Sequence, residues 1–368
     1  RHAFGCLIVF AGLNPDMPAS GRLRRVWLSL CGVWFVLQVL IAVLNSFGTS
    51  ASVFSTASLG HGSLLGWLID TLTPLVVMLY MEARPRTFVD AILCFNWDRA
   101  SRGTAFTLFF IAMLLVVLDS SFYVFLARDV EVCPDNLEVC THGTFWYELI
   151  SSTYVIRPFL WTPVFVLCTC FALECHTHCV RAARYLGVMV RGGGMRTIDG
   201  INDAFAKHLQ NLWEMRDSAE RWEQPLGLLN FMLLLYAVDN IASAILTDEP
   251  TTPMHVLHLL VAVTLQLTML VSLGRIHWTW LKVKDGAILF KMDSFRDREL
   301  NLARMRFLQH LGAAESSMKP YHFTLTMRHA IIAAQTYGVL VAGLLLKPLI
   351  VAQLRGGGQV QPGGSMSG

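Results

Sequence analysis

Long apolar runs alternate with polar loops along the chain. Each run has about 17 to 25 residues, the length that a helix needs to cross about 30 Å of hydrocarbon. The seven runs are Val26–Phe47, Leu64–Tyr80, Thr104–Ala127, Leu149–Ala172, Leu226–Leu246, Met254–Leu273 and His329–Val351. The pattern therefore predicts an all-α membrane protein with seven transmembrane helices.

Basic residues are distributed unequally among the loops. The segment before Val26 holds four Arg, and the second, fourth and sixth loops hold four, seven and ten Lys or Arg. The first and fifth loops hold none, and the third holds only Arg128. Because basic loops stay in the cytoplasm, the N-terminus is predicted to be cytoplasmic and the C-terminus extracellular, the reverse of a G-protein-coupled receptor.

Composition agrees with this class. Of the 368 residues, 54% are hydrophobic and only 15% are charged. The net charge of +3 follows from the basic cytoplasmic loops, so we expect lipids around the chain and no nucleic-acid partner. The sequence has no Walker motif, nucleophile elbow or HExxH, and we expect neither an enzyme nor a cofactor or metal.

The two longest cytoplasmic loops carry helical stripes of apolar residues. These are Ile201, Phe205, Leu209 and Leu212 in the fourth loop, and Leu300, Ala303, Phe307 and Leu311 in the sixth. The spacing predicts helices that pack with extensions of the fourth and sixth spans in a cytoplasmic anchor layer. The alternative is that they lie flat on the inner leaflet.

Ionisable side chains within spans are costly and are therefore candidate site residues. Asp70, Asp119, Arg157 and Asp239 all fall roughly 9 to 12 Å below the outer surface, at 1.5 Å per residue. The aromatic residues Tyr123, Tyr154, Trp161 and Tyr236 lie near the same layer. This layer predicts an outward-facing pocket for a small hydroxyl-rich or cationic molecule. The alternative, compatible with a pocket, is that Arg157 pairs with one or two Asp residues and braces the bundle.

The seventh run has a face of small residues, Ala334, Gly338 and Ala342, which allows close helix packing or borders a central pore. Gln335 and Thr336 add polar groups in its inner half. Val339 and Leu346 are candidates for an apolar constriction that gates by dewetting. The alternative is a tightly packed core helix.

Cysteine and histidine residues give weaker signals. Cys133 and Cys140 in the third loop either form a disulfide or remain two unpaired thiols. The inner end of the fourth span carries Cys168, Cys170, Cys175, His176, His178 and Cys179, whose spacing fits no standard zinc set and favours palmitoylation. His255 and His258 at the outer edge of the sixth span are expected to be interfacial.

Three stretches resemble the gustatory receptor family of the insect chemoreceptor superfamily. They are FAGLNP (residues 10–15), WEQPLGLLNFMLLLYAVDN (residues 222–240) and the region from Phe307 to Gly343. In the last of these, Thr336-Tyr337 matches the Thr-Tyr of the family's terminal motif. The motif's Gln falls on Gly343 and its Phe on Leu344, so this chain departs from the family there.

The resemblance implies a gustatory chemoreceptor, a ligand-gated non-selective cation channel in the plasma membrane that a small-molecule tastant opens. It implies a tetramer of this chain or of related subunits, with Gln335, Thr336, Val339, Ala342, Gly343 and Leu346 along or near the pore. The expected divisions are 1–273 for the N-terminal segment and six-helix bundle with its ligand pocket, 274–328 for the anchor helices, 329–351 for the pore helix and 352–368 for a disordered tail. A transporter, or a non-conducting membrane receptor or structural protein, is the alternative. A membrane zinc enzyme would need several His near the inner leaflet, where the last span has only His329.

Overall fold

The computed structural model describes residues 18–47, 64–83, 143–191, 196–246, 253–288, 297–313 and 324–356, with scattered helical positions between 103 and 121. Seven helices are defined: α2 (Pro18–Phe47), α3 (Leu64–Ala83), α6 (Gly143–Arg191), α7 (Ile198–Leu246), α8 (Pro253–Ile288), α9 (Arg298–Ala313) and α10 (Met327–Gly356). The described residues contain no strand. The predicted all-α fold is confirmed for this part of the chain.

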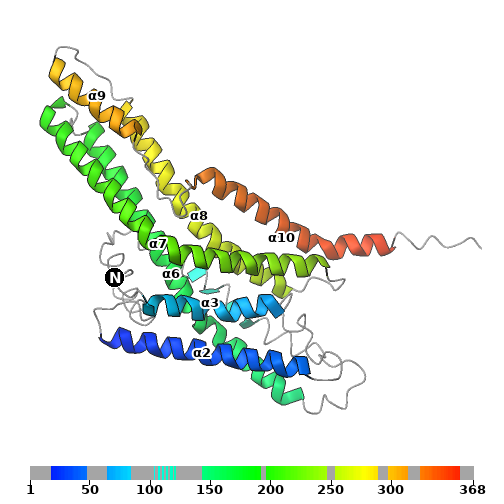
Figure 1. The fold of residues 1–368 in the computed structure, drawn as a ribbon. Helices are drawn as coiled ribbons and strands as arrows, with labels where there is room; N and C mark the ends of the chain where they lie inside the picture. Colours follow the sequence, from blue (N-terminus) through cyan, green and yellow to red (C-terminus); the bar gives the residue numbers. More distant parts are fainter. Residues whose placement is uncertain are drawn as a thin grey trace, which may run out of the picture.

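Each predicted span except the third coincides with one of these helices. Among the residues searched, five helices are long and apolar enough to cross a membrane: α2, α6, α7, α8 and α10. α3 is apolar as well and packs along α2 (Figure 1). The third span is described only at scattered positions, all of them helical.

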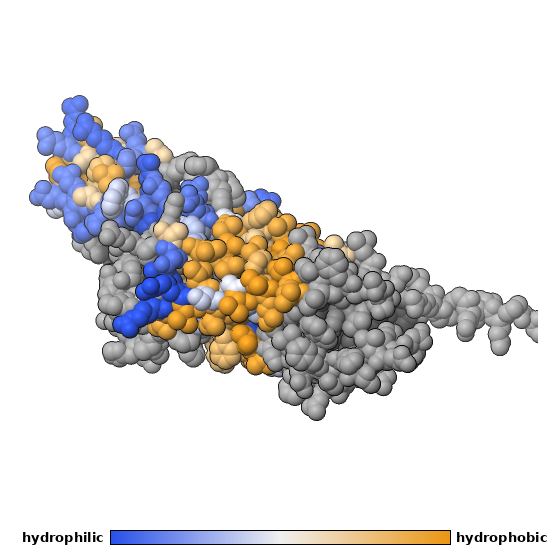
Figure 2. Space-filling view, turned by 60° about the horizontal axis from the view of Figure 1, so that its bottom comes forward, coloured by the Kyte–Doolittle hydropathy of each residue, from blue (hydrophilic) through white to orange (hydrophobic). Residues whose placement is uncertain are grey.

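Helices α6, α7 and α8 are longer than a membrane crossing. They contain 49, 49 and 36 residues, so that α6 and α7 are each roughly 74 Å long at 1.5 Å per residue. The excess lies at the end where α9 packs (Figure 1), and hydrophilic residues gather over that end, whereas hydrophobic residues cover the middle of the molecule (Figure 2). The predicted extensions of the fourth and sixth spans are present.

Helix α9 packs on α7 and α8 rather than standing apart from them. Its buried residues are Leu300, Arg304, Phe307 and Leu311, and Phe307 meets Phe205 of α7 edge-to-face with ring centroids 6.2 Å apart. The predicted packing of α9 on the helix extensions is therefore confirmed, and its cytoplasmic location stays a prediction. The predicted stripe of α9 is confirmed at Leu300, Phe307 and Leu311, whereas Ala303 is half-buried and Arg304 is buried in its place. In α7 the stripe is wrong at one position, since Leu209 is 42% exposed and His208 is buried.

The sequence places a loop and a span on either side of Pro225, but α7 runs through this proline without a break. Figure 1 shows that α7 bends about half way along its length, and a proline is an established cause of such a bend. Neighbouring helices supply the packing that compensates for the lost backbone hydrogen bond. α10 also continues to Gly356, beyond the predicted end at Val351.

Candidate functional site

Arg157 forms the centre of a buried polar cluster that joins four helices. Its Nε and Nη2 donate to the two carboxylate oxygens of Asp70 at 2.9 and 2.8 Å. Nη2 also donates to the Tyr236 hydroxyl at 3.3 Å, and Nη1 lies 3.2 Å from Nε2 of His258. Both ion-pair side chains are only 1% exposed. The cluster therefore connects α3, α6, α7 and α8 through one guanidinium.

The contact with Arg157 fixes the protonation state and the tautomer of His258. A guanidinium has only donors, so Nε2 of His258 must accept the hydrogen bond and the ring is neutral, with its proton on Nδ1. The prediction that His258 is interfacial is wrong, because its side chain is fully buried and its ring centroid lies 5.8 Å from that of Tyr236. The sequence shows no partner for this histidine because Arg157 lies 101 residues away.

Two other predicted pocket residues, Trp161 and Asp239, lie one helical turn from members of the cluster. Trp161 is buried one turn after Arg157, with its ring centroid 6.0 Å from the guanidinium carbon. Asp239 is half-buried, one turn after Tyr236. Tyr154 belongs to α6 one turn before Arg157, but its side chain is outside the described part of the structure, as are Asp119 and Tyr123.

This geometry has the character of a brace. Every nitrogen of the Arg157 side chain is directed at Asp70, Tyr236 or His258, and a buried ion pair needs such additional hydrogen bonds to offset the cost of desolvation. A small cavity lies between α3, α6 and α7, starting about one turn after Asp70. Its volume is about 10 Å³, and Thr73, Leu167 and Met232 are among its lining residues. That volume holds about one water molecule, too little for a ligand.

The predicted pore residues all lie on the exposed part of α10. Gln335, Thr336, Val339, Ala342, Gly343 and Leu346 are exposed in the single chain. Val339 is 72% exposed, and only 11% of the apolar window of this helix is buried. The alternative of a tightly packed core helix is therefore wrong for the isolated chain.

The opposite face of α10 is attached to α8. Ala330 and Leu344 are buried on this face, and the Tyr337 hydroxyl donates to the side-chain oxygen of Gln266. At the start of α10, a Cβ on Gly274 would stand 2.8 Å from the backbone nitrogen of Met327. Glycine is therefore required where α8 and α10 cross.

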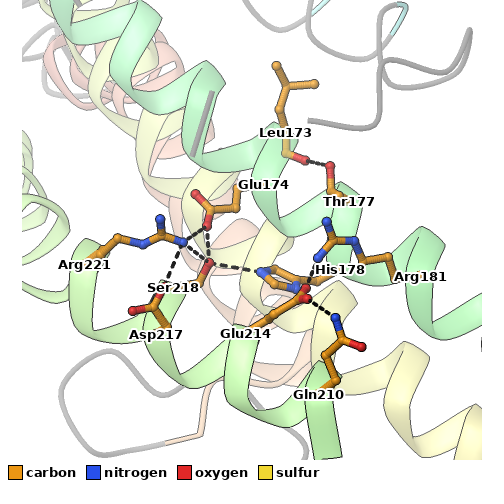
Figure 3. Close-up of polar contacts among 10 residues, drawn as sticks. All are labelled: Leu173, Glu174, Thr177, His178, Arg181, Gln210, Glu214, Asp217, Ser218 and Arg221. Atoms are coloured by element: carbon orange, nitrogen blue, oxygen red, sulfur yellow. Dashed lines mark hydrogen bonds and ion pairs between the residues drawn. The ribbon is translucent and has the colours of Figure 1, made fainter. Parts of the chain in front are cut away.

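A second polar network joins α6 and α7 at the inner end of the fourth span (Figure 3). Buried Glu174 accepts hydrogen bonds from the Ser218 hydroxyl, from the Trp222 indole and, at 3.1 Å, from Arg221. Nε2 of His178 lies 3.0 Å from the same hydroxyl. Sequence analysis did not find this network, because its two halves are 40 to 48 residues apart and nothing in the local pattern pairs them.

The network continues along the extensions of α6 and α7. Arg181 pairs with Glu214, and Gln210 donates to the other carboxylate oxygen at 3.0 Å. The two helices are thus joined over about two turns by charge-assisted hydrogen bonds, which are stronger than neutral ones. Helix α6 therefore has a second stiff connection to α7, besides the one at Arg157.

His208 is a buried titratable group in the packed layer of α7, α8 and α9. Its ring stacks on Tyr185 and meets Trp280 and Phe307 edge-to-face, with His310 5.7 Å away between ring centroids. Burial, followed by the nearby His310 and Lys284, lowers the pKa of His208 to about 4. The residue is therefore neutral near pH 7.

The structure tests some of the predictions about the cysteines. Cys168, Cys170, Cys175 and Cys179 are free and buried, which leaves little thiol surface for the predicted palmitoylation. The described residues contain no group of three or more side chains suited to a metal ion. Cys133 and Cys140 lie outside the described residues, and their disulfide stays a prediction.

Two solved structures have a similar arrangement of helices over nearly the whole chain. The insect olfactory receptor OR5 from Machilis hrabei aligns with a TM-score of 0.65 and 12% identity, covering 94% of this chain and 96% of that one. The structure of OR5 in complex with eugenol aligns with a TM-score of 0.60 and 12% identity, covering 94% and 97%. This chain has the fold of an insect olfactory receptor. No protein-family model matches the sequence, and no curated protein matches it.

Proposed function

We propose that this chain is a chemoreceptor subunit of a ligand-gated, non-selective cation channel, opened by a small molecule. The observation that carries the proposal is the exposed face of α10, which includes Val339 at 72% exposure and Leu346 at 50%. A membrane helix attached on one side only is suited to meet copies of itself. The likeness to OR5, a receptor by name, supports this kind of function and supports the expectation that the chain is not an enzyme.

In the proposed assembly, four copies place α10 around a central axis. Val339 and Leu346 form the apolar constriction, and cations pass when the helices separate and the constriction is wetted. Gln335, Thr336, Ala342 and Gly343 border the same path. Related receptor subunits take the place of some copies if the channel is a heteromer.

The proposed orientation has a cytoplasmic N-terminus and an extracellular C-terminus in the plasma membrane. It rests on the basic residues of the even-numbered loops. With this orientation, the hydrophilic end formed by α9 and the extensions of α6, α7 and α8 lies in the cytoplasm. Epitope tags at each terminus, detected with and without permeabilisation, test it.

The ligand pocket is proposed for the outer half of the bundle, beside the Arg157 cluster. Asp119, Tyr123, Tyr154 and Asp239 are the residues proposed to contact the ligand, and Asp70, Arg157, Trp161 and Tyr236 form its wall. A ligand that alters this wall displaces α3, α6, α7 and α8 together, because all four carry a member of the cluster. Since α10 is attached to α8 through Tyr337 and Gln266, the displacement reaches the proposed pore.

The ligand class is proposed as a small organic tastant, and the gustatory role rests on the sequence motifs. Eugenol, bound in one of the OR5 structures, is a suitable first compound to test, together with sugars and other hydroxyl-rich molecules. A ligand-evoked cation current in cells that express only this chain is the expected result. No current from any compound, with normal surface expression, would favour a heteromer or the alternatives.

The decisive experiment is single-particle imaging of the purified full-length chain. We expect fourfold particles with α10 at the axis. Monomers or dimers without a central axis would remove the pore and favour a transporter or a non-conducting membrane receptor. Proteoliposome flux measurements then separate these two, because a transporter moves a solute across the membrane and a non-conducting receptor does not.

A further inference from the structure

A groove lies between α6 and α8, away from the Arg157 cluster. Its volume is about 150 Å³, and its walls are successive turns of the two helices, from Ala172 to Cys179 on α6 and from Thr268 to Arg275 on α8. An apolar cavity of about this volume accommodates a molecule the size of benzene. The groove therefore has room for several carbon atoms.

The two ends of the groove differ in polarity. Helices α6 and α8 run in the same direction (Figure 1), and Cys179 and Arg275 are close enough to interact at one end. Ala172 and Leu273 are the predicted inner ends of the fourth and sixth spans. The groove thus crosses the level at which hydrocarbon gives way to headgroups, with its apolar end toward the membrane centre and Arg275 at the headgroup end.

Helix α8 continues this gradient along one exposed stripe. Val271, Arg275, Trp278 and Lys282 follow one another at helical spacing, and all four are exposed. The ammonium of Lys282 lies 3.6 Å from the ring centroid of Trp278. Tryptophan and basic residues in this order are typical of a helix surface at a cytoplasmic membrane interface.

Arg275 differs from the arginines near it in its electrostatic surroundings. Arg181 pairs with Glu214 and Arg221 with Glu174, whereas Arg275 makes no ion pair within the part of the chain that the structure describes. His176 lines the same groove and adds an imidazole ring to it. A cation next to an apolar groove complements an amphiphile with a negative head and a hydrocarbon chain.

We propose that this groove binds an anionic phospholipid of the inner leaflet. One acyl chain lies along Ala172 and Val271, and the phosphate contacts the guanidinium of Arg275. The choice of leaflet rests on the proposed orientation of the chain, but the site itself does not. Because the groove walls belong to α6 and α8, a bound lipid maintains the spacing of two helices that also carry Arg157 and His258.

Native mass spectrometry of the full-length protein in detergent tests the site. Phosphatidic acid and phosphatidylcholine with the same acyl chains are titrated, and glycerol phosphate serves as the soluble phosphate. We expect tighter binding of phosphatidic acid and little binding of glycerol phosphate. Equal binding of glycerol phosphate would mean that a free phosphate site, not a lipid site, is present, and would overturn the proposal.

Two substitutions separate the head and chain contacts. Arg275→Gln is expected to lower phosphatidic acid affinity about fivefold, since one basic residue near a membrane surface contributes about that much. Arg298→Gln, on the exposed start of α9, removes the same charge elsewhere and is expected to leave affinity unchanged. Val271→Trp fills the groove and is expected to reduce binding of both phospholipids. Elution volume and thermal denaturation confirm that each variant is folded.

Unchanged affinity in Arg275→Gln, or an equal loss of affinity in Arg298→Gln, would overturn the proposal. Lipid binding that disappears whenever copies of the chain associate would also overturn it, because the groove would then be a subunit contact. Binding is measured without any current. If the chain binds the lipid but conducts no current, only the proposed function is contradicted. If the chain conducts and Arg275→Gln leaves lipid binding unaltered, only the lipid site is contradicted.

Discussion

Arg157 and Asp70 form a two-point ion pair inside the helix bundle, with N–O distances of 2.9 and 2.8 Å and both side chains 1% exposed. Fork-to-fork pairing of this kind fixes the relative position of two helices in angle as well as in distance. It joins α3 to α6 across 87 residues of sequence.

Asp70→Asn is expected to destabilise the protein strongly, because it leaves the buried charge of Arg157 without a counter-charge. Removal of one partner of a buried pair typically costs about 3–5 kcal/mol. Thermal denaturation followed by fluorescence size-exclusion measures the loss. Asp70→Leu combined with Arg157→Met should be less harmful than either single change, and Arg216→Gln at the exposed pair with Glu220 should have no measurable effect. A double variant worse than both singles would argue against a brace.

Gly274→Val is expected to disturb the start of α10. The added Cβ would stand 2.8 Å from the backbone nitrogen of Met327, which cannot move without shifting the helix. We expect a lower apparent melting temperature and loss of ligand-evoked current. Gly312→Ala in α9 is the control, because nothing lies within 4 Å of its added Cβ. Wild-type current in Gly274→Val would show that α10 does not need this crossing.

Tyr337→Phe removes one hydrogen bond between α10 and α8 while keeping the ring. The expected loss is about 0.5–1.5 kcal/mol in stability. If the contact transmits the ligand signal, the half-maximal ligand concentration shifts while surface expression stays normal. Dose–response curves of cation current measure the shift, and Gln266→Leu should reproduce it.

Val339→Cys tests the proposed pore lining. Val339 is 72% exposed, whereas Leu344 on the same helix is buried against the bundle at 5%. A charged thiol reagent should block current through Val339→Cys, faster in the presence of ligand, and should leave Leu344→Cys unaffected. Equal modification of the two variants would mean that the exposed face of α10 does not line a water-filled path.

Acidification should loosen the packed layer of α7, α8 and α9 through His208. Its pKa is lowered from 6.5 to about 4 in the folded protein, so the unfolded chain takes up a proton first as the pH falls. The stability is complete above pH 6.5 and is lost progressively as the pH falls toward 4. Thermal denaturation between these values should be less pH-dependent in His208→Leu. Tyr185, His310 and Lys284 also face this ring, and His310→Gln serves as the neighbouring control.

The sequence predicts the spans well because lipid selects long apolar helices whatever their partners are. It also predicts the layer that contains Arg157, since depth follows from the distance to a span end. It does not predict which acid pairs with Arg157, or that His258 joins them, because these contacts depend on helix rotation and packing. The buried position of His208 next to exposed Leu209 shows the same limit, since one residue of rotation turns a helix by about 100°.

The continuity of α7 through Pro225 also depends on packing that the sequence does not show. A proline usually marks the end of a helix in water, and the sequence treats Pro225 in that way. Within the bundle, packing maintains the helix on both sides of the proline, and one element extends from Ile198 to Leu246. The Glu174 network adds to this packing, with Ser218, Arg221 and Trp222 all within two turns before Pro225.

The bend of α7 gives the subunit mechanical leverage. The segment from Ile198 to Pro225 extends roughly 40 Å at 1.5 Å per residue. With Pro225 as the fulcrum, a tilt of only a few degrees in the membrane half, too small to break a side-chain contact, moves the far tip of this rod by roughly 2–3 Å. The tips of α7 and α9 at the hydrophilic end are therefore the places where a distance probe, such as a pair of spin labels, would report ligand binding with the greatest amplification.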